Sequence, residues 1–217
     1  MINLETQNSI FNQFVSELRD EKIQKDRMRF RKNLHRIGEI FAYEISKTFN
    51  YSSKQVTTPL GIKEMQLCDD KVVICSILRA ALPLHEGLLD YFDCADNGFI
   101  SAYRKTDKSG GFTVRMEYLA CPDMNDCTLI LCDPMLATGT SLVKAYQALL
   151  ELGTPKHTHL VSVVSSTLAI EYVEKHIPQK DVKLWVGAID EELTSQSYIV
   201  PGLGDAGDLA FGVKLPN

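Results

Sequence analysis

The sequence of 217 residues predicts an α/β protein built on a doubly wound parallel sheet. Short, nearly continuous apolar runs that are typical of buried strands alternate along the chain with longer runs whose apolar residues recur at helical spacing. This alternation favours parallel strands, because consecutive parallel strands need a crossover connection that is usually a helix. The length suits one large domain with a substantial core, so we expect residues 1–217 to form a single domain.

Two helices are predicted first, over roughly residues 10–18 and 27–49, and an extended connector is expected at 55–59. One face of the second helix carries an apolar stripe, and the opposite face carries five basic residues between Arg27 and Arg36. A basic face of this kind is typical of a solvated helix surface, although it could also bind an anion or a partner subunit.

Strands and helices then alternate. The strands are predicted at 72–78, 99–104, 128–132, 160–165 and 184–189, and the helices at 83–92, 140–152 and 168–177. Residues 105–122 break the alternation, since a polar turn at 107–111 between two extended stretches predicts a protruding β-hairpin arm. The arm could be a flexible lid or a plain surface hairpin. The tail after residue 189 is rich in glycine and carries few helix signals.

Composition argues against several classes of function. The net charge is −5, which disfavours a general nucleic-acid binder. No apolar run approaches the ~20 residues of a membrane-spanning helix, and the first ten residues lack the pattern of a signal peptide, so we expect a cytoplasmic protein. The six cysteines form no Cys-x-x-Cys pair, and the histidines show no metal-ligand spacing. Cys75 and Cys132 lie in apolar strands and are expected to be small core residues.

A buried strand, a hydroxyl-rich loop and a helix start follow one another at residues 129–141. The apolar strand ends at Asp133, whose carboxylate suits the hydroxyls of a ribose. Four small residues then precede the helix: Thr138, Gly139, Thr140 and Ser141. The first amides of a helix lack intrahelical partners and the helix dipole favours an anion there, so this arrangement predicts a phosphate site. Such hydroxyls are more often helix caps, but the aspartate at the carboxyl end of a buried strand favours a ligand.

The tail contains the pattern Gly-x-Gly-x-x-Gly at residues 202–207. The dinucleotide fingerprint needs a preceding strand and a following helix within a βαβ unit, and only ten residues remain after Gly207. A dinucleotide site is therefore rejected. The glycines favour either a loop whose backbone approaches a small planar ligand or a series of tight turns.

Together these residues resemble the uracil phosphoribosyltransferase family, from about residue 30 to the end. Asp133–Ser141 looks like that family's loop for phosphoribosyl diphosphate (PRPP), and 198–208 looks like its uracil-recognition segment, the more specific of the two. Ile77–Ala80 resembles the loop that contacts pyrophosphate, and Ser101–Arg104 is similar to an arm with a second PRPP-binding arginine. The family fold is the type I phosphoribosyltransferase sheet with a hood, which we expect at 190–217.

The resemblance implies an enzyme of pyrimidine salvage that converts uracil and PRPP to UMP and diphosphate. The implied catalytic residues are Arg79, Arg104, Asp133 and Asp205. The implied PRPP-binding residues are Arg79, Arg104, Asp133, Pro134, Met135, Leu136, Ala137, Thr138, Gly139, Thr140, Ser141 and Asp205. Main-chain groups of Ile199, Gly204, Asp205 and Ala206 are expected to bind uracil.

The resemblance also implies partners. Mg²⁺ is expected to arrive bound to PRPP, with Asp205 reaching toward it, so no dedicated protein metal site is predicted. A homo-oligomer is expected, and GTP is a candidate activator.

The chain departs from the family pattern at several positions. Ala81 stands in place of a usual glycine and would be strained if that position needed a positive φ, and Pro83 follows soon after it. Lys105 stands where an acid is common, and Leu209 where a basic residue is common. These departures motivate an alternative, a regulatory protein of the same fold that senses PRPP or UMP with little catalysis. A purine phosphoribosyltransferase is a lesser alternative, because Tyr198 is the only clear aromatic stacking partner in the tail.

Overall fold

The structure is a computed structural model that describes residues 1–106 and 112–214, and of residues 102–106 and 112–116 it describes the backbone. Its centre is a sheet formed by β1 (Ile2–Asn3), β4 (Val72–Leu78), β5 (Asp96–Thr106), β6 (Phe112–Ala120), β7 (Thr128–Cys132), β8 (Met135–Leu136), β9 (His157–Ser166) and β10 (Val182–Asp190). The strand order is β1-β10-β9-β7-β4-β5-β6, with β8 beside β9. All pairs are parallel except β5–β6. The predicted parallel sheet is confirmed.

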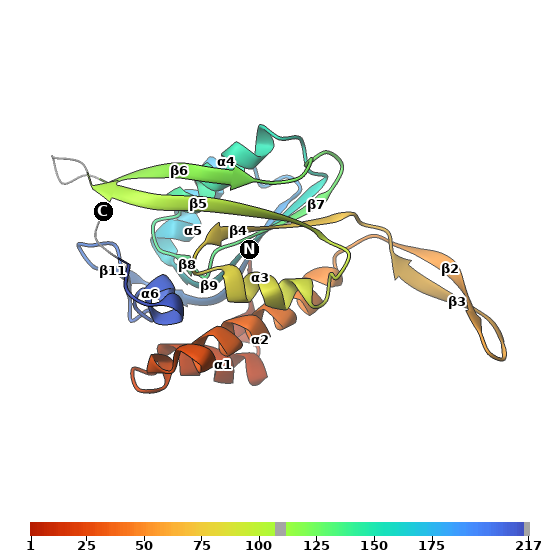
Figure 1. The fold of residues 1–217 in the computed structure, drawn as a ribbon, viewed down its shortest axis with the longest axis horizontal. Coiled ribbons are helices and arrows are strands. Elements are labelled where there is room, and N and C mark those ends of the chain that lie inside the picture. The colour runs from red at the N-terminus through yellow and green to blue at the C-terminus, as the bar shows by residue number, and fades with distance from the viewer. Residues whose placement is uncertain (107–111, 215–217) are drawn as a thin grey trace.

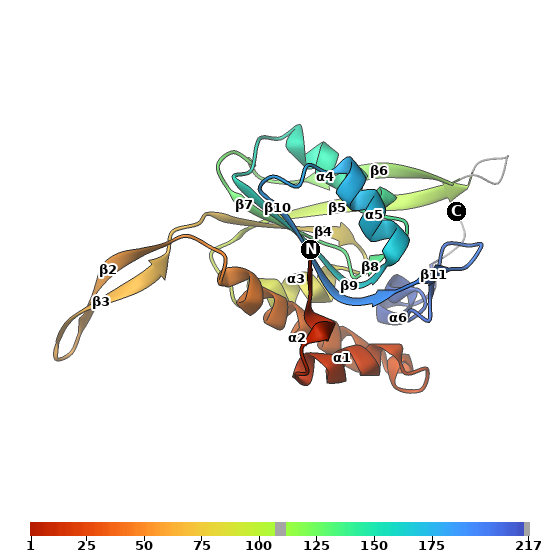
Figure 2. The same ribbon diagram turned by 180° about the vertical axis from the view of Figure 1, so that it is seen from behind.

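Helices cover both faces of this sheet (Figures 1 and 2). One face packs against α1 (Ile10–Arg19), α2 (Arg27–Ser46) and α3 (Leu82–Leu89), and the other packs against α4 (Thr140–Leu150) and α5 (Thr167–His176). Successive strand residues point to opposite faces. Ile74 thus joins the cluster with α1 to α3, while Cys75 joins the cluster with α4 and α5. Cys75 and Cys132 are both fully buried, as predicted.

The order of the strands reverses between β4 and β7. From β4 the chain proceeds through α3 to β5 and β6 at one edge, then returns to β7 on the other side of β4 and continues to β9 and β10. Connections from the two neighbouring strands therefore leave on opposite faces. A crevice opens at such a reversal, outside the carboxyl ends of the strands, and open α/β sheets bind their ligands there.

A bidentate ion pair joins α1 to α2. Arg29 donates two hydrogen bonds of 2.8 Å to the Glu17 carboxylate, and Asn33 donates a third of 2.7 Å. Arg31, also on the basic face, donates to the Ala210 carbonyl. Arg27, Arg29 and Lys32 are exposed, as expected of a solvated face, while Arg29 and Arg31 also make contacts within the chain.

The ion pair predicts a pH-dependent stability. The hydrogen bonds from Arg29 and then Asn33 hold the pKa of Glu17 at about 2, below the ordinary value of 4.5. Because the folded pKa is the lower one, the stabilisation is complete above pH 4.5 and is lost as pH falls toward 2. We expect Glu17→Gln to lower the Tm at pH 6, and the difference from wild type to shrink between pH 4.5 and 2 in calorimetry. A difference that stays constant over this range would contradict the assignment.

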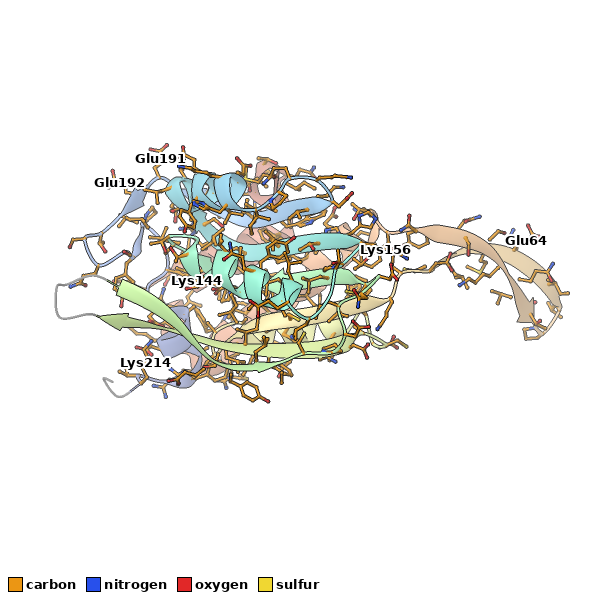
Figure 3. The ribbon with its side chains drawn as sticks, turned by 90° about the horizontal axis from the view of Figure 1, so that it is seen from above. Glu64, Lys144, Lys156, Glu191, Glu192 and Lys214 are labelled. Atoms are coloured by element: carbon orange, nitrogen blue, oxygen red, sulfur yellow. The ribbon has the colours of Figure 1, made fainter. Side chains whose placement is uncertain are left out.

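An antiparallel hairpin, β2 (Tyr51–Thr58) and β3 (Gly61–Cys68), stands where an extended connector was expected. Residues 55–58 are extended, as predicted, but they belong to β2 rather than to a connector, and Pro59 lies in the turn. The hairpin gave no buried-strand pattern because its residues are nearly all exposed. It projects away from the sheet and helices, with Glu64 far from the body of the molecule (Figure 3).

The predicted second hairpin is present as β5 and β6. These strands pair antiparallel, with a register shift between Ser101 and Ala102. The hairpin begins at Asp96, earlier than the predicted start at 105. The reason is that β5 and β6 are also the last two strands of the central sheet. The predicted turn at 107–111 lies outside the described residues.

The tail folds into a small hood at the end of the molecule opposite the β2–β3 hairpin (Figure 1). It contains the strand pair β11 (Glu192–Leu193) and β12 (Ile199–Val200), and the helix α6 (Ala206–Phe211). Helix signals are few in this part of the sequence because α6 is six residues long. Among the described residues, no helix combines the length and the apolar character needed to cross a bilayer.

Candidate active site

The carboxyl ends of β4 and β7 carry two of the predicted site residues. Arg79 directly follows β4 and Asp133 directly follows β7, and these strands pair side by side as far as Ser76 and Cys132. The Met135 amide donates to the Asp133 carboxylate at 3.3 Å, which folds the start of the loop back on its first residue. Both residues therefore lie at the edge of the sheet where its strand order reverses.

The first turn of α4 has the features of an anion site. Its N-cap is Gly139, with a φ of 77°, and no side chain caps the helix. The Thr138 hydroxyl donates a hydrogen bond of 3.3 Å to the Thr140 hydroxyl. The alternative in which these hydroxyls serve as helix caps is thus not what the structure shows. A phosphate would find here the first amides of α4 together with the hydroxyl groups.

Close packing explains why a glycine precedes α4. A Cβ at position 139 would lie 3.0 Å from the Ala169 carbonyl and 3.1 Å from the Tyr172 ring, and the positive φ would strain any other residue. Ser166, at the N-cap of α5, donates to the Ala137 carbonyl at 2.6 Å. The loop between β7 and α4 is therefore held in place by its contacts with α5.

The hood brings the predicted uracil-binding segment to the same region. Ile199, Leu203 and Ala206 are buried, and they belong to one hydrophobic cluster together with Ala137 of the predicted PRPP loop. Asp205 is the N-cap of α6, and its carboxylate accepts from the Asp208 amide at 2.9 Å. The two segments, more than fifty residues apart in sequence, thus share one core.

Arg79 connects the sheet to the hood. Its guanidinium lies 3.3 Å from the Asp208 carboxylate and donates to the Gly212 carbonyl at 3.2 Å. The side chain is 43% exposed, so it remains accessible to a ligand. A Cβ built on Gly207 would lie 3.2 Å from Asp205 and 4.0 Å from Arg79, which places both side chains around the start of α6.

A hydrogen-bond chain that runs from the buried Ser76 of β4 through the buried His85 to the exposed Asn97 supports β4, the strand that leads to Arg79. His85 of α3 bonds to Ser76 at 2.6 Å through Nδ1 and to Asn97 at 2.7 Å through Nε2. The side-chain NH₂ of Asn97 donates to the Ala95 carbonyl, so the side-chain oxygen of Asn97 faces His85. We therefore assign the ring proton of His85 to Nε2. Burial lowers the pKa of His85 and so favours the neutral ring that this pattern requires.

The remaining predicted positions have different outcomes. Arg104 lies in β5 opposite Val114, and its side chain is outside the described residues. Ala81 has a φ of −74°, so the strain that a positive φ would cause there is absent. Lys105 is likewise a residue of β5 whose side chain is not described. Leu209 packs against the hydrophobic core, which accounts for an apolar residue at that position.

Sequence reasoning missed three charged residues near the hood: Arg19, Asp190 and Asp208. Asp190 ends β10 and thus stands at the same edge of the sheet as Asp133, a signal that was available in the sequence. Asp208 lies inside the segment that carried the resemblance. Arg19, the last residue of α1, gave no signal because its partners lie more than 170 positions away.

Two further features of the described part of the chain lie apart from these residues. A cavity of about 480 Å³ between α2, α3 and α6 is lined by Arg31, Lys32 and His35 among others, and by none of the predicted site residues. The second feature is a cluster of three polar side chains: His35, Glu39 and Asp90. His35 of α2 lies 2.8 Å from Asp90, at the end of α3, and this contact joins the two helices.

Comparison with known proteins settles the family. The sequence model of the uracil phosphoribosyltransferase family matches residues 5–213. The chain belongs to the uracil phosphoribosyltransferase family. The match extends further toward the N-terminus than the motifs alone suggested, which began near residue 30. Membership makes the chain a transferase of pyrimidine salvage, which forms UMP and diphosphate from uracil and PRPP.

Individual relatives agree with this assignment. The chain is 51% identical to a uracil phosphoribosyltransferase of Porphyromonas gingivalis, over 99% of both chains. It is 39% identical to a protein of the same name from Pyrococcus furiosus, over 92% of this chain and 85% of the relative. A solved structure of a protein from Aquifex aeolicus matches with a TM-score of 0.87 at 28% identity, covering 99% of this chain and 100% of that one. The names of the two sequence relatives support the enzyme and give no support to the regulatory alternative.

Proposed function

We propose that catalysis takes place where the carboxyl edge of the sheet meets the hood, with Mg-PRPP lying along the edge and uracil held under the hood. The observation that carries this proposal is the contact of Arg79, at the end of β4, with Asp208 and Gly212 of the hood. Ala137 and Ala206 also belong to the same hydrophobic core cluster, as this placement requires.

PRPP would bind along residues 133–141. The 5′-phosphate would lie at the first turn of α4, where no side chain caps the helix, and would accept from its amides and from the hydroxyls of Thr138, Thr140 and Ser141. The Asp133 carboxylate would accept hydrogen bonds from the ribose hydroxyls. Its charge would also favour the positive character that develops at C1 as the bond to diphosphate breaks.

Arg79 would hold the diphosphate, with Arg104 as a second clamp. A guanidinium presents a planar fork of donors that fits phosphate oxygens, and its charge offsets the negative charge that grows on the leaving group. Mg²⁺ would enter as part of the substrate and supply further neutralisation of that charge. The carboxylates of Asp205 and Asp208 fit this role because Mg²⁺ prefers oxygen ligands, and both lie at the start of α6 beside Arg79.

Uracil would be recognised by the main chain of Ile199, Gly204, Asp205 and Ala206. The base offers two carbonyl acceptors and one N3–H donor, which backbone amides and carbonyls can match. In the reaction the bond between uracil N1 and ribose C1 forms, the bond from C1 to diphosphate breaks, and the N1 proton is released. Cytosine presents an amino group where uracil has an acceptor, which would leave buried backbone groups unpaired at about 1–3 kcal/mol each.

An assay with four bases tests the proposal. Purified protein with Mg-PRPP is expected to convert uracil to UMP and to turn over cytosine, hypoxanthine and adenine at least about a hundredfold more slowly, since unpaired polar groups in the site reject the wrong base. Comparable turnover of a purine would contradict the site as described. GTP, which the resemblance implies as an activator, is tested by adding it to the same assay. A cytoplasmic location remains part of the proposal.

We also propose a homo-oligomer in which the β2–β3 hairpin contacts a second copy of the chain. Leu60 at its turn is 99% exposed and Ile62 is 68% exposed. An isolated two-stranded hairpin is only marginally stable in water, so a projecting hairpin with apolar side chains needs a surface to cover it. The projection seen in Figure 3 suits an arm that reaches another subunit.

Changing one hairpin residue is expected to alter the assembly. Ile62→Asp places a charge on the apolar arm, and we expect it to shift the protein toward the monomer in sedimentation velocity. Met28→Asp is a matched control, because Met28 is also 68% exposed but lies on α2. An unchanged mass for Ile62→Asp would contradict the role of the hairpin.

A further inference from the structure

The geometry points to Arg19 and Asp190 as a positioning pair that fixes the uracil-reading segment from outside the site. The inference rests on the proposed reading of uracil by the main chain of residues 199–206. Neither residue belongs to that segment: Arg19 ends α1 and Asp190 ends β10. Both nevertheless contact Gly202, which lies in the middle of the segment.

The two side chains bind each other in a bidentate pair. The two terminal nitrogens of Arg19 donate to the two oxygens of Asp190, at 2.8 and 3.0 Å. The pair is largely shielded from water, since the Arg19 side chain is 21% exposed and that of Asp190 is 8% exposed. A planar fork on a carboxylate has one preferred geometry, so each side chain fixes the orientation of the other.

The pair then binds both polar backbone groups of one residue. The Gly202 amide donates to Asp190 at 2.9 Å, and the Gly202 carbonyl accepts from Arg19 at 3.1 Å. These groups belong to the two consecutive peptide planes on either side of the Gly202 Cα. With both planes held, the direction in which the chain enters residues 203–206 is set by α1 and β10.

The backbone at Gly202 is shaped for this contact. Its φ is +55°, and a Cβ at this position would collide with the Ile199 carbonyl oxygen. Only glycine avoids both problems, and glycine is also the residue that moves most freely when nothing restrains it. An external clamp is therefore needed to hold the main-chain groups of Gly204 to Ala206 in one arrangement.

Recognition through the backbone makes such a clamp important for selectivity. A side chain that reads a base can be held by its own rotamer, whereas a main-chain donor can move only with its peptide plane. Small displacements of groups that bind a substrate are costly even when their cause lies far from the chemistry. The pair should thus affect the binding of uracil while leaving the PRPP loop, which is anchored on α5, unaffected.

Glu17 offers a matched control on the same helix. Like Arg19, it lies in the last turn of α1 and takes part in a bidentate ion pair, in which the Glu17 carboxylate is buried and its partner Arg29 is about half exposed. The Glu17 pair joins α1 to α2, and the hydrogen-bond partners of the Glu17 carboxylate are Gln13, Arg29 and Asn33, which all belong to these two helices rather than to the hood. Removing either pair should cost stability, but only the Arg19–Asp190 pair should affect uracil.

The test compares Asp190→Asn, Arg19→Lys and Glu17→Gln in the full-length protein. For Asp190→Asn we expect KM for uracil to rise by at least about tenfold and KM for PRPP to change less than about twofold. Arg19→Lys keeps the charge but loses the fork, so it should give a smaller rise in KM for uracil. Glu17→Gln should lower the Tm without changing either KM.

Hydrogen exchange gives a readout that does not depend on catalysis. Without substrates, amides of 199–206 should exchange faster in Asp190→Asn than in wild type, and at the wild-type rate in Glu17→Gln. An unchanged KM for uracil in Asp190→Asn, equal rises in both KM values, or unchanged exchange of the segment would each overturn the inference. Failure of the wild type to use uracil would instead defeat the proposed function.

Discussion

Replacing Asp205 by asparagine is expected to lower kcat by roughly two to three orders of magnitude, the usual loss when a group that stabilises transition-state charge is removed. In the proposed site the Asp205 carboxylate would help to hold the Mg²⁺ that accompanies PRPP, and this ion would offset the negative charge that grows on the diphosphate. Asparagine has nearly the same shape but no charge. The change therefore removes the electrostatic contribution and leaves the backbone of the hood in place.

The structure shows why asparagine is a better replacement than alanine. Asp205 also caps α6 by accepting from the Asp208 amide at 2.9 Å, and asparagine caps helices about as well as aspartate. Asp205→Ala would lose the cap as well, at a cost of about 1 kcal/mol in the free energy of unfolding. Initial rates at saturating uracil and PRPP measure kcat, and the Tm of Asp205→Asn serves as the folding control. Wild-type turnover by Asp205→Asn would refute the role of this carboxylate.

Arg79→Ala is the second change with a large expected effect. We expect kcat/KM for PRPP to fall by roughly a hundredfold to a thousandfold, because the guanidinium faces charge that grows on the leaving diphosphate. In the absence of substrate it contacts the Asp208 carboxylate at 3.3 Å, so it is already near an anion of the hood. In the proposed site, the diphosphate of bound PRPP would compete with Asp208 for the same donors.

Arg31→Ala controls for the loss of a contact between an arginine and the hood. Arg31 donates to the Ala210 carbonyl much as Arg79 donates to the Gly212 carbonyl, yet it belongs to α2 and lies outside the proposed site. Steady-state kinetics with PRPP as the varied substrate should show a large defect for Arg79→Ala and nearly wild-type values for Arg31→Ala. Equal defects in the two variants would mean that hood stability, rather than a diphosphate clamp, explains the effect.

The central strands could be predicted because burial leaves a clear pattern in the sequence. The predicted strands 72–78 and 128–132 have the bounds of β4 and β7, since both are wholly or almost wholly apolar and buried on both faces. The β2–β3 hairpin could not be predicted in this way. Its strands are exposed on both faces, so no hydrophobic period distinguishes them from a connector.

The candidate site could be proposed from the sequence where its signal is local. Asp133 and the loop up to Ser141 are adjacent in sequence, so the chemistry of a strand end and a helix start can be recognised there. The contact of Arg79 with Asp208 spans 129 positions and that of Arg19 with Asp190 spans 171, and no pattern in either segment indicates the other. Such pairs arise only when the fold brings the hood over the edge of the sheet.

The most direct test is a crystal structure of the protein with UMP. This product contains both the phosphate and the uracil ring, so one molecule would occupy both parts of the proposed site. We predict the phosphate at the first turn of α4, beside Gly139, and the uracil ring against the main chain of 199–206. A UMP molecule whose phosphate lies there but whose base points away from the hood, or one bound elsewhere on the chain, would contradict the claim that the sheet edge and the hood form a single site.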